Sequence, residues 1–174
     1  MTTAKPSKQY SLVFVRRTSQ EGGKEVLLGL KKRGFGEGKL NGFGGKVEPG
    51  ETCEQGARRE LTEECGVVAC DMVRCGSLRF DMADKIMLCE VYTVSSWQGE
   101  IVETEEMAPL WVKEGPELEA LYDVQTWADD KFWLPILLQG ACFRGSFKYA
   151  DDDATILEHT IVVEAEAEAG AENK

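Results

Sequence analysis

Residues 45–67 read GKVEPGETCEQGARRELTEECGV, and this stretch decides what the rest of the chain can be. Glu60 precedes Glu63 and Glu64 by three and four residues, and side chains at these spacings share one side of an α-helix. Carboxylates this close repel one another, and each raises the cost of ionising the next. A divalent cation relieves that repulsion, and hard oxygen ligands suit Mg²⁺ or Mn²⁺ shared with substrate phosphates. The segment therefore indicates metal-assisted chemistry on a phosphate chain.

Helix-capping residues frame the acidic segment. Thr52 can serve as the N-cap, Gln55 stands three residues later as in a capping box, and Gly66 can end the helix. We therefore expect a helix over residues 52–65. The preceding stretch, 34–50, holds seven glycines in 17 residues, which predicts a loop whose backbone can approach a ligand closely.

The remaining pattern predicts a mixture of strands and helices without internal repeats. Runs rich in β-branched and aromatic residues predict strands, whereas longer apolar stretches predict helices. Expected strands cover 10–17, 25–31, 67–73, 75–82, 85–95, 107–113, 142–149 and 155–163, and expected helices cover 115–122 and 128–139. Residues 164–174 alternate Glu and Ala without an apolar face, so we expect an acidic, disordered tail.

Composition limits the class of protein. The 174 residues suit one compact domain, no apolar run approaches the roughly 20 residues that span a membrane, and the N-terminus lacks a secretory pattern. The net charge of −11 disfavours a nucleic-acid partner, which needs a basic surface. We expect a monomeric, cytoplasmic protein with its six cysteines reduced. Nuclear or mitochondrial nucleotide pools are alternative locations.

Basic residues nevertheless gather just before the acidic helix, at Lys31, Lys32, Arg33, Lys39 and Lys46. A local positive field beside a metal site can hold a small polyanion on an acidic protein. The patch therefore fits a small polyanion, and the family resemblance described below implies that this partner is a small-molecule nucleotide.

The residues of the acidic segment resemble the sequence motif of a known family. Every fixed position of the Nudix box is filled, by Gly45, Glu51, Arg59, Glu60, Leu61, Glu63, Glu64, Gly66 and Val67. A solvated acidic helix face, the usual meaning of a charge run, does not explain the glycine loop and this spacing together. The resemblance implies an α/β (α+β) Nudix fold, a mixed β-sheet sandwiched between helices, with residues 1–163 as a single Nudix hydrolase domain.

The resemblance extends beyond the box. The animal-type oxidised purine nucleoside triphosphate hydrolases are similar in three stretches: LGLKKRGFGEGKLNGFGGKVEPGETCEQGARREL (28–61), FDMADKIMLCEVY (80–92) and WADDKFWLPILLQ (127–139). This resemblance implies hydrolysis of 8-oxo-dGTP and 2-hydroxy-dATP to the monophosphate and pyrophosphate, which removes damaged nucleotides before they enter DNA.

Roles for individual residues follow from the same resemblance. The ligands of Mg²⁺, or of Mn²⁺, would be the Gly44 carbonyl, Glu60, Glu63, Glu64 and Glu106. Glu64 would activate the water, although the residues alone leave Glu63 as an alternative. Arg59 would orient the carboxylates by bidentate pairing, and Glu51 would brace the helix N-terminus. The substrate would contact Ser11, Lys31, Phe35, Asn41, Phe43, Gly44, Gly45, Lys46, Phe80, Met87, Trp127, Ala128, Asp129, Asp130 and Trp133.

The side chains of this expected pocket suit an oxidised purine. Trp127 offers a stacking face, and Phe35 and Phe80 offer apolar walls. Asp129 and Asp130 are adjacent acids beside aromatic residues, so one would stay protonated near neutral pH and the pair would offer one donor and one acceptor. Without the resemblance, core packing would explain the tryptophans as well, and a helix N-terminus would explain the two acids.

Two other functions stay open at this point. A Nudix hydrolase of another nucleoside diphosphate derivative, such as a dinucleoside polyphosphate, would carry the same box. A nucleotide-binding module without activity would lack one of Glu60, Glu63 and Glu64, and all three are present. Asn41 together with the two aspartates favours the oxidised purines.

Overall fold

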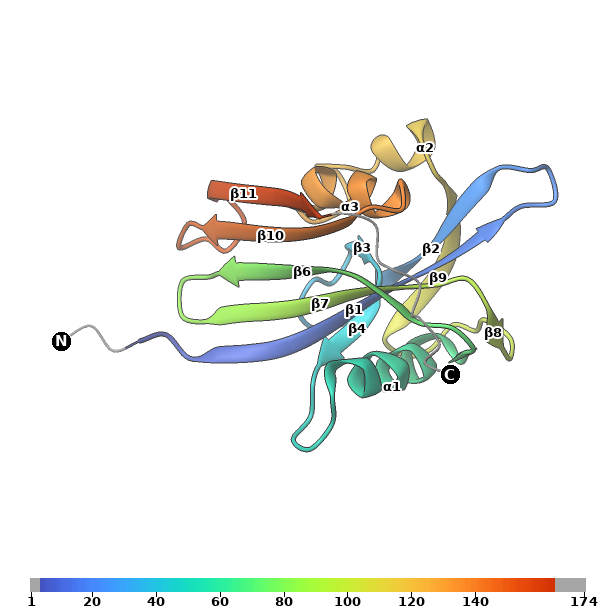
Figure 1. Ribbon diagram of the computed structural model, residues 1–174, viewed down its shortest axis with the longest axis horizontal. Helices are drawn as coiled ribbons and strands as arrows, with labels where there is room; N and C mark the ends of the chain where they lie inside the picture. The colour runs from blue at the N-terminus through green and yellow to red at the C-terminus, as the bar shows by residue number, and fades with distance from the viewer. Residues whose placement is uncertain (1–3, 165–174) are drawn as a thin grey trace, which may run out of the picture.

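A nine-stranded mixed sheet with helices on both faces forms the centre of the computed structural model, which describes residues 4–164 (Figure 1). Its strands follow the order β11-β10-β6-β7-β1-β2-β3, while β4 pairs with β1 and β9 with β2. The strands are β1 Ser7–Thr18, β2 Lys24–Lys31, β3 Leu40–Asn41, β4 Phe43–Lys46, β6 Val73–Asp81, β7 Ile86–Val94, β9 Met107–Lys113, β10 Cys142–Tyr149 and β11 Ile156–Glu164. The mixed sheet between helices is therefore confirmed.

Strand β1 lies at the centre of the fold, and both of its faces are buried. Val13 and Val15 pack with Leu61 of helix α1 (Cys53–Cys65) on one face. Phe14 packs with Trp133 of helix α3 (Asp130–Leu138) on the other. Successive side chains of a strand alternate between the faces of a sheet. The two hydrophobic cores consequently lie on opposite sides of β1, which runs parallel to β7 and antiparallel to β2 and β4.

Helix α1 begins and ends at its predicted capping residues. Thr52 Oγ1 accepts a hydrogen bond from the Gln55 amide at 3.1 Å, and Gln55 Oε1 accepts one from the Thr52 amide at 2.8 Å. Gly66 follows the helix with a φ of 83°, a left-handed conformation that glycine adopts without a steric penalty. Ala57 and Leu61 are buried against the sheet, which leaves the acidic side of the helix free for chemistry.

The glycine-rich stretch was expected to be a loop and instead contains two short strands, β3 and β4. The physical reason is visible at Gly44, where a Cβ atom would lie 1.9 Å from the Ser11 carbonyl oxygen. Only glycine lets β4 approach β1 this closely. The expected strand over 67–73 is also wrong, because β5 covers only Val68–Ala69 and pairs with an unpredicted strand, β8 (Trp97–Gln98).

The two later helices are shorter than the sequence predicts. Helix α2 covers Pro116–Glu119, and α3 begins at Asp130 and carries Pro135 inside it. Glu164, expected in the acidic tail, is the last residue of β11 and pairs with Arg144; residues 165–174 lie outside the described part of the chain. No helix within residues 4–164 is long and apolar enough to cross a membrane.

Candidate active site

One side of α1 opens onto a concave surface that we call the acidic hollow. It is lined by Arg33, Glu48, Arg59, Glu60, Glu63, Glu64, Thr104, Glu105 and Glu106. These residues come from the chain between β2 and α1, from α1 itself and from the segment before β9. The three α1 glutamates therefore face one space, together with a fourth acid, Glu106, that is distant in sequence.

Arg59 organises the carboxylates of the hollow. Its guanidinium donates to Glu51 at 2.6 and 3.1 Å, to Glu60 at 2.9 Å and to Glu63 at 3.2 Å. A planar fork of fixed donors holds several carboxylates at defined angles, which a lysine could not do. The hydrogen bond from Arg59 lowers the pKa of Glu51. Burial raises the pKa of Glu60, and the same arginine opposes that rise.

Glu64 differs from its neighbours because it is only 3% exposed. Its Oε2 accepts a hydrogen bond from the Gly44 amide at 3.0 Å, which ties α1 to β4. Burial raises the pKa of Glu64 to about 8, and the charges of Glu60 and Glu106 add to the rise. Burial therefore brings the pKa of Glu64 into the range in which general acid–base groups act.

The donor set of the acidic hollow suits a hard divalent cation, since it offers carboxylate oxygens and no sulfur or imidazole. Within residues 4–164, however, no three acidic, thiol or imidazole side chains converge on one point. Arg59 holds Glu60 and Glu63, while Lys31 and Arg33 lie 3.7 and 3.3 Å from the Glu106 carboxylate. The residues fit a magnesium-type ion by chemistry, and the carboxylates would have to turn away from these cations to bind it.

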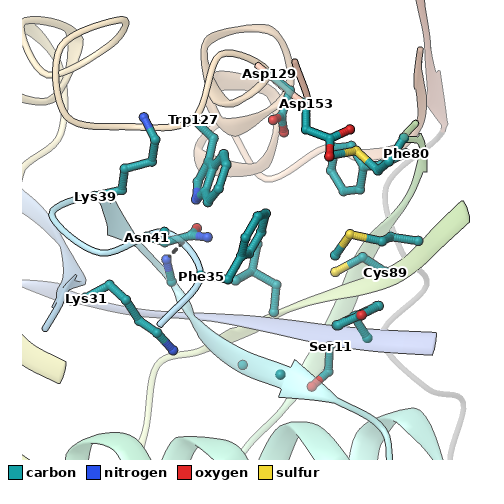
Figure 2. Close-up of a pocket in the computed structure, with 18 of the residues that line it drawn as sticks. Ser11, Lys31, Phe35, Lys39, Asn41, Phe80, Cys89, Trp127, Asp129 and Asp153 are labelled. Carbon is teal, nitrogen blue, oxygen red and sulfur yellow. Dashed lines mark hydrogen bonds between the residues drawn. The ribbon is translucent and has the colours of Figure 1, made fainter. Parts of the chain in front are cut away.

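Beside the hollow lies a cavity of about 290 Å³ that we call the apolar pocket (Figure 2). Its lining includes Tyr10, Ser11, Lys31, Phe35, Lys39, Asn41, Gly44, Gly45, Glu64, Phe80, Met82, Met87, Cys89, Trp127, Asp129, Tyr149 and Asp153. This volume is at the small end of the range for ligand sites. Glu64 lines both the pocket and the acidic hollow, so the two spaces meet at that side chain.

Two adjacent buried acids lie at one end of the apolar pocket. Asp129 accepts hydrogen bonds from Trp133 Nε1 at 2.7 Å and from the Tyr149 hydroxyl at 2.6 Å. Asp130 accepts one from the Trp127 amide at 3.0 Å. Burial raises the pKa of both acids, and the charge of Asp129 helps to raise that of Asp130 well above its ordinary value. Both shifts favour the protonated form of the pair, and the rise is stronger at Asp130.

Aromatic rings form another wall of the pocket. Phe35 stacks on Trp127 with ring centroids 5.0 Å apart, although the phenylalanine is 64% exposed. Gly36 permits this contact, since a Cβ atom there would lie 2.8 Å from the Trp127 ring. Lys39 Nζ lies 5.2 Å from the same ring, a cation–π distance. Figure 2 shows these two rings facing each other among the residues that line the pocket.

Polar groups in the pocket are few and specifically placed. Asn41 Oδ1 accepts from the Gly42 amide at 2.8 Å, which leaves its NH₂ group as a donor. Ser11 Oγ is buried without a hydrogen-bond partner in the described part of the chain. A buried unpaired hydroxyl is costly, so a ligand that bonds to Ser11 would recover that energy.

A comparison with protein families identifies this arrangement. The model of the NUDIX domain matches residues 8–129. The chain belongs to the NUDIX family. This match covers every residue that lines the acidic hollow, and the lining residues of the apolar pocket from Tyr10 to Asp129.

Individual Nudix proteins resemble the chain over most of its length. The oxidized purine nucleoside triphosphate hydrolases of Danio rerio and Mus musculus are 41% and 40% identical to it, over 89% of this chain and 94% of theirs. The crystal structure of the MutT protein from Bacillus halodurans superposes with a TM-score of 0.73 at 22% identity, covering 88% of this chain and 97% of the other. That structure supports the Nudix fold.

Most substrate contacts expected from the sequence lie in the apolar pocket, and five do not. Phe43 and Trp133 are core residues on opposite faces of the sheet. Lys46 is exposed at the end of β4, and Ala128 is half-buried outside the lining. Asp130 is buried behind Asp129 and bonds to the backbone of Trp127. Adjacent residues on one segment point in different directions, and substrate contact by these five residues stays a prediction.

Several pocket residues were missed by the sequence reasoning, namely Tyr10, Leu12, Gly36, Lys39, Gly42, Met82, Cys89, Met107, Tyr149 and Asp153. A signal existed for Cys89, because it stands two residues after Met87 and so shares its face of β7. No comparable signal existed for Tyr149 and Asp153. They reach the pocket because β10 pairs with β6, where Phe143 lies opposite Gly76 and Lys148 opposite Asp81.

Proposed function

We propose that this chain hydrolyses oxidised purine nucleoside triphosphates, such as 8-oxo-dGTP and 2-hydroxy-dATP, to the monophosphate and pyrophosphate. One observation carries the proposal: the apolar pocket and the acidic hollow meet at Glu64. A purine in the pocket would place its phosphate chain in the hollow. The names of the zebrafish and mouse relatives support this substrate class.

The pocket would recognise the base through a few groups. Trp127 would stack on the purine ring, because a π-face suits any planar base. Asp129 would accept a hydrogen bond from a ring N–H, and Asn41 would donate to a carbonyl oxygen. The Ser11 hydroxyl would gain the partner that it lacks. Recognition would therefore rest on a small number of directed hydrogen bonds in an otherwise apolar space.

The hollow would perform the cleavage. Gly44, Glu60, Glu63, Glu64 and Glu106 would hold Mg²⁺, with Mn²⁺ as an alternative. When bound, the cation would neutralise phosphate charge and make the attacking water more acidic. Glu64 would take the proton from that water, since burial sets its pKa near neutrality. Arg59 would keep the carboxylates oriented, and Lys31 would attract the phosphates. We further propose that the protein acts as a cytoplasmic monomer.

A pyrophosphate-release assay tests the function. Purified protein is compared on 8-oxo-dGTP, 2-hydroxy-dATP, dGTP and a dinucleoside polyphosphate, with Mg²⁺ and with a chelator. We expect the highest kcat/KM on an oxidised purine triphosphate and no turnover with the chelator. Equal or better turnover of the dinucleoside polyphosphate would instead support the other class of Nudix substrate, because this compound carries a second nucleoside that the single pocket does not explain.

A further inference from the structure

Asp129 is held by donors from two different elements. The Tyr149 hydroxyl at the end of β10 lies 2.6 Å from Oδ1, and Trp133 Nε1 on α3 lies 2.7 Å from Oδ2. Tyr149 is 6% exposed and lines the apolar pocket beside Asp129. Both oxygens of one buried carboxylate are therefore already engaged on the protein side.

The two hydrogen-bond donors determine which protonation state of Asp129 is favoured. An indole N–H can only donate, so Oδ2 must be an acceptor. A phenol can donate or accept, and a donated bond makes Oδ1 an acceptor as well. Hydrogen bonds received by both oxygens favour the ionised carboxylate. Asp130 receives a single backbone hydrogen bond, from the Trp127 amide, and is the better place for the proton.

We propose that Tyr149 is a positioning residue, which holds the Asp129 carboxylate as a fixed hydrogen-bond acceptor in the pocket and leaves the proton of the acid pair on Asp130. The role rests on the proposed function, because it assumes that Asp129 meets the base. A base must then present an N–H group at this end of the pocket. Tyr149 thereby takes part in base selection without touching the reacting phosphate.

The charges around the pair permit this assignment. The titratable groups that face it from other elements are Lys39 in the glycine-rich stretch, Cys89 on β7, Tyr122 before α3, Tyr149 on β10 and Asp153 after β10. Burial raises the pKa of Cys89 and of both tyrosines far above neutrality. These three are neutral, and in the described structure neither Lys39 nor Asp153 forms a hydrogen bond with Asp129.

The substitution Tyr149→Phe tests the role, because it removes one oxygen and keeps the ring in place. We expect KM for 8-oxo-dGTP to rise about tenfold, in line with a lost hydrogen bond to a charged group, while kcat changes by less than about twofold. The acidic limb of the kcat/KM profile should move to higher pH, since Asp129 loses a donor that favours its ionised form. A packing role alone would not move that limb.

Tyr92→Phe is the matched control. Tyr92 is a buried tyrosine of the other hydrophobic core, and within residues 4–164 its hydroxyl makes no side-chain hydrogen bond with Asp129 or Asp130. Its removal should leave KM and the pH profile unchanged. If Tyr149→Phe behaves like Tyr92→Phe in both measurements, Tyr149 is a packing residue and the proposal is wrong.

A carbon-13 NMR titration of the Asp129 carboxyl separates this proposal from the proposed function. It needs no substrate, and we expect Asp129 to titrate at higher pH in Tyr149→Phe than in the wild-type protein. An unchanged titration overturns the positioning role, whatever the activity. Conversely, a shifted titration in a protein that does not hydrolyse oxidised purine triphosphates would support the positioning role and reject the function.

Discussion

The acidic hollow and the apolar pocket both contain clustered carboxylates, and they relieve the repulsion in different ways. In the hollow, Glu60 and Glu63 share one permanent cation, the guanidinium of Arg59. In the pocket, Asp129 and Asp130 have no direct ion pair among the described residues and are buried among neutral donors. Positive charge compensates the carboxylates of the hollow, whereas burial raises the pKa of both pocket acids and favours their protonated form.

This difference explains how one residue type performs two tasks. A carboxylate held by an arginine stays ionised and can exchange that partner for another cation. A carboxyl group deprived of water and of counter-charges becomes a neutral donor at physiological pH. Glu64 lies between these cases, because it is as buried as the pocket acids but faces the acids of the hollow.

Glu64→Gln should give the largest effect. Glutamine keeps the shape of the side chain but cannot accept a proton, so kcat should fall by about 10³-fold, while substrate binding, followed by quenching of tryptophan fluorescence, persists. Glu54→Gln is the control, because Glu54 lies on the same helix and pairs with Arg58 at the surface. If the variant retains a substantial kcat, Glu64 is not the base and Glu63 becomes the candidate.

Asp129→Asn should give the next largest effect. The amide NH₂ group would face the donors of Trp133 and Tyr149 or the base, and a mismatched buried polar group is strongly disfavoured. We expect kcat/KM for 8-oxo-dGTP to fall about 10²-fold, mainly through KM. Asp123→Asn serves as control, since Asp123 pairs with Lys131 at the surface. An effect on kcat alone would place Asp129 in cleavage rather than recognition.

Arg59→Lys should reduce kcat about tenfold. Lysine keeps the charge but cannot hold Glu51 and Glu60 together with a planar fork, so the carboxylates lose their orientation. The free energy of unfolding in urea should also fall, by about 1 kcal/mol. Arg58→Lys, in an exposed pair with Glu54, should change neither quantity appreciably. Equal behaviour of the two variants would show that orientation by Arg59 is unimportant.

Asp130→Asn should give the smallest effect on activity, within about threefold, because an amide resembles a protonated carboxyl group. Its effect should appear in stability against pH. The folded protein raises the pKa of Asp130, so it retains a proton that the unfolded chain releases, and stability falls as pH rises through that range. The free energy of unfolding in urea should fall less between about pH 5 and about pH 8 in the variant than in the wild-type protein. If stability falls equally between these pH values in both proteins, the proton is not on Asp130.

Local sequence signals predicted one half of the site well. The capping residues Thr52 and Gln55, the terminator Gly66 and the carboxylates between them act within one helix, and spacing along a helix determines direction. The same reasoning predicted that Arg59 pairs with its neighbouring acids, and its hydrogen bonds confirm the pairing.

The apolar pocket depends on contacts between strands that are distant in the sequence, and the spacing of residues along the chain does not encode these contacts. Tyr149 meets Asp129 only because β10 lies beside β6 and under α3. Trp133, for which a substrate contact stays a prediction, packs against Phe14 and Phe143. The side chain of a tryptophan four residues after an acid can point to a ligand or to the core. Its direction depends on how the helix crosses the sheet, which the local sequence does not specify.

The bond between Glu64 and the Gly44 amide has a consequence for substrate length. This bond fixes the apolar pocket relative to the acidic hollow, so under the proposed function it would set the distance between the bound base and the phosphate that is cleaved. A nucleotide with fewer phosphates would fill the pocket without reaching the far acids, and one with a longer bridge would carry its scissile bond past them. The chain would therefore select its substrates by the length of their phosphate chain as well as by their base.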